Sequence, residues 1–305
     1  MPPVFWRRSQ EFSVLFSPAL PPLTETRPGQ AALAPFGSYP MTRRQHLARM
    51  LMHERPLGRG RLRRVAVSWF QQGPQIVDGT LFGYRVRFYP RDNQTDAKGA
   101  VCGALYKRRE LCWLRRILSP DASFVDIGAN MGFFSLYAAR CHTRKILAVE
   151  ANPVLMDRFR ETLALNEPLP IWCVSCAAGA TSGNGQLRPR HHDLGSGQIS
   201  AVTYKKTQTG QQAATISVRP LKDIVQEAGL KTITLMKLDI EGMEHAVLDT
   251  YFRNVSPMLY PQHLILERPV HREAQQALEH LLIASSLYRI SGRTRVNFLL
   301  SRNLS

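Results

Sequence analysis

Long hydrophobic runs and a regular set of cysteines are both missing from this chain of 305 residues. No stretch approaches the ~18 to 20 apolar residues that a membrane-spanning helix needs. The cysteines number five and follow no regular spacing, which argues against a disulfide framework. A short apolar patch near the start is interrupted by arginine, glutamate and proline, so it makes a poor signal peptide. These absences predict a cytoplasmic protein with reduced thiols.

Acidic residues are scarce in the first part of the chain. The whole sequence has 40 Lys and Arg against 23 Asp and Glu, a net charge of +17. Residues 1–119 carry 20 of these basic residues and 7 of the acidic ones, whereas residues 120–305 carry 20 and 16. Three partners suit such a basic region: nucleic acid, an anionic membrane surface touched peripherally, or an acidic acceptor molecule.

The sequence changes in character along its length. Residues 1–41 are rich in proline and lack periodicity, which predicts a disordered segment. Residues 42–104 form a predicted basic cap region. From residue 105 to 305 strands alternate with helices, which predicts one α/β domain with a mostly parallel, doubly wound, Rossmann-like sheet. Within this domain, residues 171–179 are expected to form a single strand and residues 287–301 an antiparallel pair.

A glycine turn in "VDIGANMG" marks a candidate cofactor site. Gly128 and Gly132 lie where a strand turns into a helix, and Glu150 ends the next strand. Glycines there let a ligand approach the backbone, and an acid at the second strand end can bind both ribose hydroxyls. The spacing G-x-x-x-G differs from the G-x-G-x-x-G of NAD sites. Asp126 just before the turn would repel a pyrophosphate but attract an ammonium group, which favours S-adenosylmethionine over NAD.

The stretch "LMKLDIEGMEHAVL" carries a second candidate site. In a strand, Lys237, Asp239 and Glu241 share one side, and unpaired charges are costly to bury. Ligand crevices in open α/β sheets lie beyond the carboxyl ends of the strands, where charge is tolerated. We therefore expect Asp239 and Glu241 to face a cleft. The alternative is a structural Lys237–Asp239 pair, with Glu241 merely close to a helix N-terminus.

Two other groups of residues are weaker candidates. His191, His192 and Asp193 could supply a base or metal ligands, although a solvated polar loop accounts for them better. Cys173 and Cys176 have C-x-x-C spacing, but they lie in a strand pattern and fit core cysteines.

The segments "FVDIGANMGFFSLYAAR", "AVEANP", "ISVRPLKDI", "LMKLDIEGMEHAVL" and "LILE" together resemble the FkbM-type family of S-adenosylmethionine-dependent methyltransferases. The resemblance runs in order from about residue 105 to 268. It implies a class I methyltransferase fold, with a seven-stranded sheet that ends in a reversed hairpin. By position it assigns Asp126, Gly128, Asn130, Gly132 and Glu150 to the cofactor, and Asp239 and Glu241 to the acceptor. One departure is that Lys107 follows Tyr106 where the family often has glutamate; Glu110 could substitute.

The resemblance implies O-methylation of a hydroxyl on a sugar, a glycan or another metabolite. Asp239 is then the first candidate for the general base and Glu241 the second. Glu267 ends the strand that follows in sequence, and it could instead share a magnesium ion with Asp239 if the two strands are neighbours. We predict no metal site.

RNA methylation is the alternative function, motivated by the basic N-terminal region. Against it, "DIEG" replaces the Asn/Asp-Pro-Pro-Tyr block that suits a base amine, and no Pro-Cys nucleophile is present. For the cap, we expect the segment 42–70 to pack its apolar side on the catalytic domain and to place arginines over the cleft mouth.

Overall fold

A computed structural model describes residues 34–53, 60–190, 193–201, 214–240, 242–269 and 272–303. All of them belong to one compact unit, Leu33–Ser305. Among these residues, no helix is both long and apolar enough to cross a membrane.

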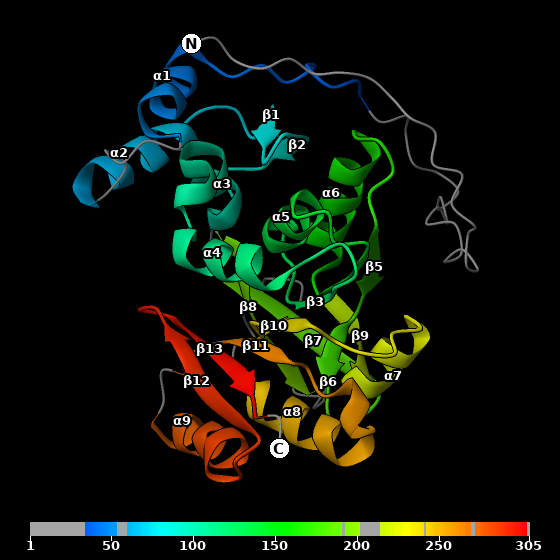
Figure 1. The fold of residues 1–305 in the computed structure, drawn as a ribbon. Helices are drawn as coiled ribbons and strands as arrows, with labels where there is room; N and C mark the ends of the chain where they lie inside the picture. The colour runs from blue at the N-terminus through cyan, green and yellow to red at the C-terminus, as the bar shows by residue number, and fades with distance from the viewer. Residues whose placement is uncertain are drawn as a thin grey trace, which may run out of the picture. The chain divides into compact units, whose positions relative to one another are not determined.

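The centre of this unit is a seven-stranded sheet (Figure 1). Its strands are β3 Ser123–Ile127, β4 Lys145–Glu150, β5 Ile171–Ser175, β10 Leu235–Leu238, β11 His263–Glu267, β12 Tyr288–Arg293 and β13 Asn297–Arg302. Their order in the sheet is β12-β13-β11-β10-β3-β4-β5. Pairing is parallel from β11 to β5, and β13 runs opposite to the other six strands, pairing antiparallel with both β11 and β12. This arrangement confirms the predicted mostly parallel sheet with a reversed hairpin at one end.

Helices cover both faces of the sheet, as the alternating sequence predicts. One face packs against α4 Arg108–Ile117, α5 Phe133–Arg140 and α6 Pro153–Ala164. The other face packs against α7 Leu221–Glu227, α8 Glu244–Asn254 and α9 Arg272–Glu279, which continues as a π-helical turn, His280–Ala284. Single 3₁₀ turns lie at Gly103–Leu105 and Pro257–Leu259.

Side-chain alternation along β10 explains where its charged residues lie. Met236 and Leu238 are fully buried in the core beneath α7 and α8. Lys237 points to the opposite side, toward the neighbouring strand β3. The strand ends at Leu238, so Asp239 already belongs to the turn that leaves the sheet. The charge of Asp239 thus lies beyond the carboxyl end of the parallel strand.

A second sheet of four strands lies beside the first. It consists of β6 Ala177–Gly179, β7 Gly183–Arg190, β8 Asp193–Ala201 and β9 Ala214–Pro220, in the order β6-β9-β7-β8. The expected single strand over residues 171–179 was therefore wrong. It ends at Ser175 and the chain enters the second sheet, because residues 177–179 pair with β9 and not with β4. Cys173 and Cys176 are unpaired, half-buried and buried respectively.

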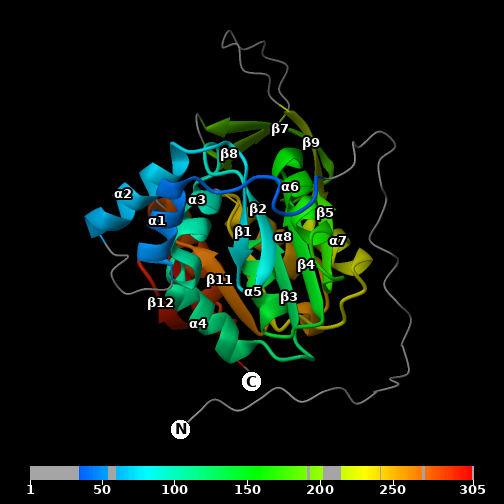
Figure 2. The same ribbon diagram turned by 90° about the horizontal axis from the view of Figure 1, so that it is seen from above.

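The cap region comprises α1 Arg43–Met52, α2 Gly60–Gln71, β1 Val77–Leu81, β2 Tyr84–Phe88 and α3 Gln94–Cys102. A capping box between Thr42 and Gln45 begins α1. The cap and the α4–α6 face of the sheet share one continuous hydrophobic core. Figure 2 shows α3 between the outer helices α1 and α2 and the rest of the molecule.

The predicted disorder of residues 1–41 does not hold for its last part. The backbone amides of Gly37 and Tyr39 both donate to the buried carboxylate of Asp78, which also pairs with Arg87. Residues 1–33 lie outside the described residues.

Candidate active site

A cavity of about 250 Å³ opens at the carboxyl ends of β3, β4 and β10. This is the switch point of the sheet, where the chain turns to one side for β4 and to the other for β10. We call one side the sheet wall, formed by Gly128, Asn130, Glu150, Lys237, Asp239 and Glu267. We call the opposite side the cap wall, formed by Gln94, Thr95, Lys98, Tyr106 and Lys107.

The glycine turn is built as predicted. Gly128 has a φ of +77°, and a Cβ there would collide with the carbonyl oxygen of Asp239. Gly132 has a φ of +83°, and a Cβ there would collide with the ring of Phe159. Only glycine suits both positions. Gly128 lines the cavity, whereas Gly132 lies outside its lining and serves the packing of α5 against α6.

Glu150 presents a buried carboxylate at the end of β4. Its two oxygens accept hydrogen bonds from the amides of Asn130 at 2.7 Å and Asn152 at 2.8 Å. Burial raises the pKa of Glu150, although these two amides and the nearby Lys237 act in the opposite direction. Each oxygen keeps a lone pair free of these bonds, and the side chain lines the cavity. Glu150 can therefore accept further hydrogen bonds from a ligand.

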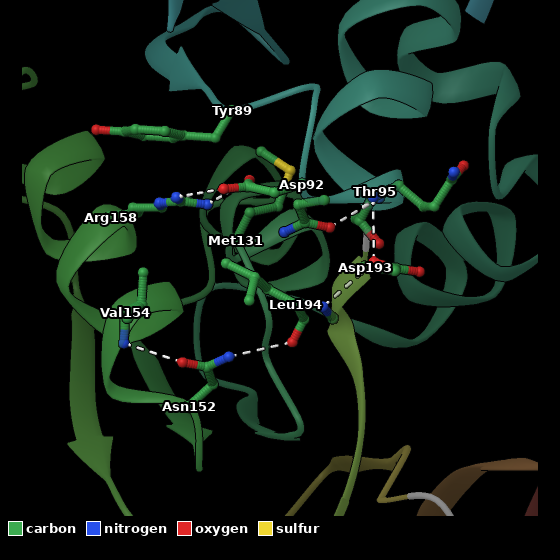
Figure 3. Close-up of polar contacts among 12 residues, drawn as sticks. Tyr89, Asp92, Thr95, Met131, Asn152, Val154, Arg158, Asp193 and Leu194 are labelled. Carbon is green, nitrogen blue, oxygen red and sulfur yellow. Dashed lines mark hydrogen bonds and ion pairs between the residues drawn. The ribbon is translucent and has the colours of Figure 1, made fainter. Parts of the chain in front are cut away.

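Two asparagines fasten the loops around the cavity. The Asn130 side chain accepts from Asn93 at 2.6 Å, which ties the glycine turn to the start of α3. The Asn152 side chain caps α6 through Val154 and donates to the carbonyl of Leu194 on β8 (Figure 3). A bidentate Arg158–Asp92 pair, with Tyr89 stacked on the guanidinium at 3.9 Å, holds the same region. The cavity is thus closed by loops from three parts of the chain.

Asp126 lies beneath the cavity and does not line it. The side chain is fully buried, accepts a hydrogen bond from Ser135 and has its other oxygen 3.3 Å from the ammonium of Lys237. Direct contact between Asp126 and a cofactor stays a prediction. In the described structure its charge serves to hold Lys237.

Lys237 joins the two halves of the sheet wall. Its ammonium donates to the carbonyl of Gly128 at 3.1 Å and lies 3.7 Å from the carboxylate of Asp239. Burial alone would lower the pKa of Lys237, but the carboxylates of Asp126 and Asp239 outweigh burial and raise it. The side chain therefore stays charged and compensates two acids at once.

Asp239 lines the cavity, and 37% of its side chain is exposed. The parallel pairing of β10 and β11 places it beside Glu267, with which it forms a hydrogen bond. Burial tends to raise the pKa of Asp239, but Lys237, Lys107 and the bond to Glu267 lower it overall. Asp239 is therefore ionised at neutral pH and available to accept a proton.

The condition for a shared magnesium ion is met in part, because the strands that carry Asp239 and Glu267 are neighbours. Within the described ranges, however, no group of three acidic, histidine or cysteine residues converges on one point. Glu241 lies outside the described residues, as do His191 and His192. The acceptor-facing role of Glu241 stays a prediction.

The cap wall is cationic. Lys98 and Lys107 each hold an ammonium 5.7 Å from the centre of the Tyr106 ring. Burial lowers the pKa of Lys98, as do its cationic neighbours Lys107 and Arg63, whereas Asp193 opposes this shift. Glu110, expected as a substitute acid, lies elsewhere: it accepts hydrogen bonds from Thr294 and Asn297 and ties α4 to the terminal hairpin.

Segment 42–70 was predicted to place arginines over the cleft mouth. Its described residues do not line the cavity, where α3 lies instead, but Arg63 comes close enough to act on Lys98 and Tyr106 of the cap wall. The sequence analysis also missed Lys98 and Asn152 as lining residues. Asn152 had a usable signal, because Asn before Pro at a helix start indicates an N-cap. Lys98 had none.

The model of a protein family described as "Methyltransferase FkbM domain" matches residues 126–282, just over half of the chain. Methyltransferase sdnD of Sordaria araneosa is 31% identical over 159 residues, which cover 43% of this chain and 61% of the relative. Methyltransferase 1 of Beauveria bassiana (strain ARSEF 2860) is 27% identical over 149 residues, which cover 42% and 58%. The chain thus spans about three fifths of the length of these relatives.

Two solved structures resemble parts of the chain at low sequence identity and low TM-score. M. capricolum TrmK, in complex with S-adenosyl-homocysteine, is 10% identical with a TM-score of 0.37, covering 64% of this chain and 68% of its own. The ribosomal protein L11 methylase of Lactobacillus delbrueckii subsp. bulgaricus is 13% identical with a TM-score of 0.40, covering 65% and 80%. Because the FkbM domain match covers more than half of the chain, the chain belongs to the FkbM family of S-adenosylmethionine-dependent methyltransferases.

Proposed function

We propose that the protein is an S-adenosylmethionine-dependent O-methyltransferase that acts on a hydroxyl of a sugar, a glycan or another metabolite. The observation that carries this proposal is Asp239, an ionised carboxylate open to the cavity at the switch point of the sheet. A carboxylate in that place suits the removal of a hydroxyl proton.

The residues around the cavity fit the proposed cofactor. Glu150 offers carboxylate oxygens for two ribose hydroxyls, and the glycine turn leaves room beside Gly128. Small or apolar side chains at Ala177, Ala178 and Leu187 suit the faces of an adenine ring. When bound, S-adenosylmethionine supplies a methyl group on a positively charged sulfur. A nucleophile can attack this methyl carbon and displace the sulfur, which leaves as a neutral thioether.

Asp239 would act on the acceptor. Its carboxylate accepts a hydrogen bond from the hydroxyl and takes the proton as the oxygen gains the methyl group. A carboxylate of low basicity is sufficient, because an alkylated hydroxyl is a strong acid late in the transfer. Lys237 keeps the carboxylate of Asp239 ionised and oriented. Catalysis otherwise depends on aligning the two reactants.

The cap wall points to the kind of acceptor. Lys98 and Lys107 place two ammonium groups beside the cavity, where Asp193 acts on Lys98 and Lys107 acts on Asp239. An acceptor that carries a carboxylate or a phosphate would compensate these cations.

The free thiols of all five cysteines support the predicted cytoplasmic location, which stays a prediction.

The test is methyl transfer from labelled S-adenosylmethionine to a panel of sugars, acidic glycans, hydroxylated metabolites and RNA. We expect label on a hydroxyl, and more readily on anionic members of the panel. Label on RNA alone would favour the alternative RNA methyltransferase. Loss of transfer with EDTA, restored by magnesium, would replace the role of Asp239 as a base by one as a metal ligand with Glu267.

A further inference from the structure

Exposed apolar side chains gather on the two outer helices of the cap. The described residues contain nine large apolar side chains that are clearly exposed, and six of them lie on α1 and α2. We call these six the outer apolar patch: Leu47, Met50, Leu51, Leu62, Val65 and Trp69. Their exposed fractions run from 39% for Leu51 to 60% for Leu62. Single exposed apolar residues are ordinary, but a group on adjacent helices indicates a binding surface.

The apolar residues of α2 follow two separate stripes. Ala66, Val67 and Phe70 are buried against the cap core. Leu62, Val65 and Trp69 recur at i, i+3 and i+7, which places them along one line on the outside of the same helix. A helix that only needed to pack on the cap would have polar residues there.

Helix α1 repeats this arrangement. Ala48 and Met52 enter the core, whereas Leu47, Met50 and Leu51 lie together on the exposed side. The side chain of Gln45 donates to the carbonyl of Phe70 and fastens α1 to α2. The packed faces of both helices are therefore already in use, and the outer apolar patch is additional to them.

The charged residues of the two helices themselves have one sign. Arg43, Arg44, Arg61 and Arg64 are exposed on the two helices, and neither helix contains an aspartate or a glutamate. Figures 1 and 2 both show α1 and α2 side by side at one edge, with α3 separating them from the sheet. Neither helix lines the cavity, so this surface is distinct from the proposed active site.

We propose that α1 and α2 dock on the surface of a membrane that contains anionic lipids. The apolar stripes would enter the boundary between head groups and acyl chains, Trp69 would lie at the interface, and the arginines would contact lipid phosphates. Nucleic acid would use the arginines but gain little from six exposed apolar side chains. A second copy of the chain would cover the apolar stripes but bring the arginines of both copies together.

The test is co-sedimentation of the full chain with vesicles of phosphatidylcholine alone or mixed with phosphatidylserine. We expect binding to the mixed vesicles that weakens as salt rises, because surface electrostatics are screened. The triple variant Leu62→Ser, Val65→Ser, Trp69→Ser should bind at least roughly tenfold more weakly, since apolar burial drives insertion. Its matched control is Val154→Ser, Met258→Ser, Val296→Ser, which removes three exposed apolar residues elsewhere and should bind like the native protein.

The arginines are tested separately. Arg61→Gln with Arg64→Gln should weaken binding to the mixed vesicles by roughly fivefold for each arginine. Circular dichroism melting checks that each variant folds, which is expected because all of these side chains are exposed. Failure to bind mixed vesicles overturns the proposal. So does binding of an RNA oligonucleotide that the arginine variants lose and the triple variant keeps, or a concentration-dependent dimer that the triple variant abolishes.

Discussion

The two walls of the cavity differ in charge, in origin and in how their charges are compensated. The sheet wall consists of residues at strand ends, and its acids Asp239 and Glu150 have partners in Lys237 and in backbone amides. The cap wall comes from α3 and the start of α4, and its two lysines are compensated only weakly. The sheet wall lies within the residues that match the FkbM domain, whereas the cap wall precedes them.

This difference suggests a division of labour. Strand ends at a switch point are held by the sheet itself, so they can place carboxylates for a cofactor and for a proton with little strain. Helices that pack on the sheet from outside can change their exposed residues more freely. We infer that the sheet wall serves the chemistry and the cap wall the choice of acceptor, and four experiments test this inference.

The largest effect is expected for Asp239→Asn in the sheet wall. The substitution keeps the shape of the side chain but replaces the carboxylate, which can accept a proton, by a neutral amide. Methyl transfer should therefore fall by roughly a hundredfold or more. Calorimetry should show nearly unchanged binding of S-adenosylmethionine. Asp249→Asn, which only breaks a surface pair with Arg253, is the control. A fully active Asp239→Asn protein would leave the Lys237–Asp239 pair as a structural feature.

Glu150→Ala should act on the cofactor. It removes charge-assisted hydrogen bonds worth about 1.5 to 3 kcal/mol each, so S-adenosylmethionine should bind at least tenfold more weakly. The amides of Asn130 and Asn152 also lose their acceptor, so part of the loss will come from the loop. Glu167→Ala on the surface serves as the control. Unchanged affinity in calorimetry would remove Glu150 from the cofactor site.

A third experiment concerns the pKa of Asp96, a buried acid on α3 of the cap. Burial raises the pKa of Asp96 to about 7, against about 3.9 in an unfolded chain. The folded protein therefore binds a proton that the unfolded chain has released, and stability should fall as the pH rises between these two values.

Asp96→Asn removes this charge. At about pH 8 the variant should be more stable than the native protein by about 1 to 2 kcal/mol, and near pH 5 the difference should shrink. Urea unfolding at both pH values measures it. A difference that does not depend on pH would show that Asp96 is compensated in the folded protein.

The smallest effect is expected for Lys98→Met combined with Lys107→Met in the cap wall. For an anionic acceptor, KM should rise by roughly fivefold, because two partly exposed cations each contribute modestly. The kcat and the affinity for S-adenosylmethionine should change little. Lys222→Met, on the surface beside Asp223, is the control. If the double variant weakened cofactor binding instead, the cap wall would belong to the cofactor site and the division of labour would fail.

Much of the fold could be predicted because its signals are local. Alternating strands and helices predicted the parallel sheet, and alternation within β10 predicted that Met236 and Leu238 face one side and Lys237 the other. The G-x-x-x-G pattern predicted a glycine turn between strand and helix, and Gly128 and Gly132 have the positive φ that favours glycine. Strand ends predicted that Glu150 and Asp239 reach the same crevice, because parallel strands end at the same edge.

Other features were decided only by the tertiary structure. Asp126 and Lys237 are far apart in sequence, and the pairing of β3 with β10 brings them together. Lys98 on α3 and Lys107 at the start of α4 both line the cavity, a position that depends on how these helices pack on the sheet. Residues 177–179 leave the main sheet because they find a partner in β9. Sequence periodicity indicates which side of its own strand or helix a residue faces. Which distant residue it contacts depends on how segments that are far apart in sequence pack together.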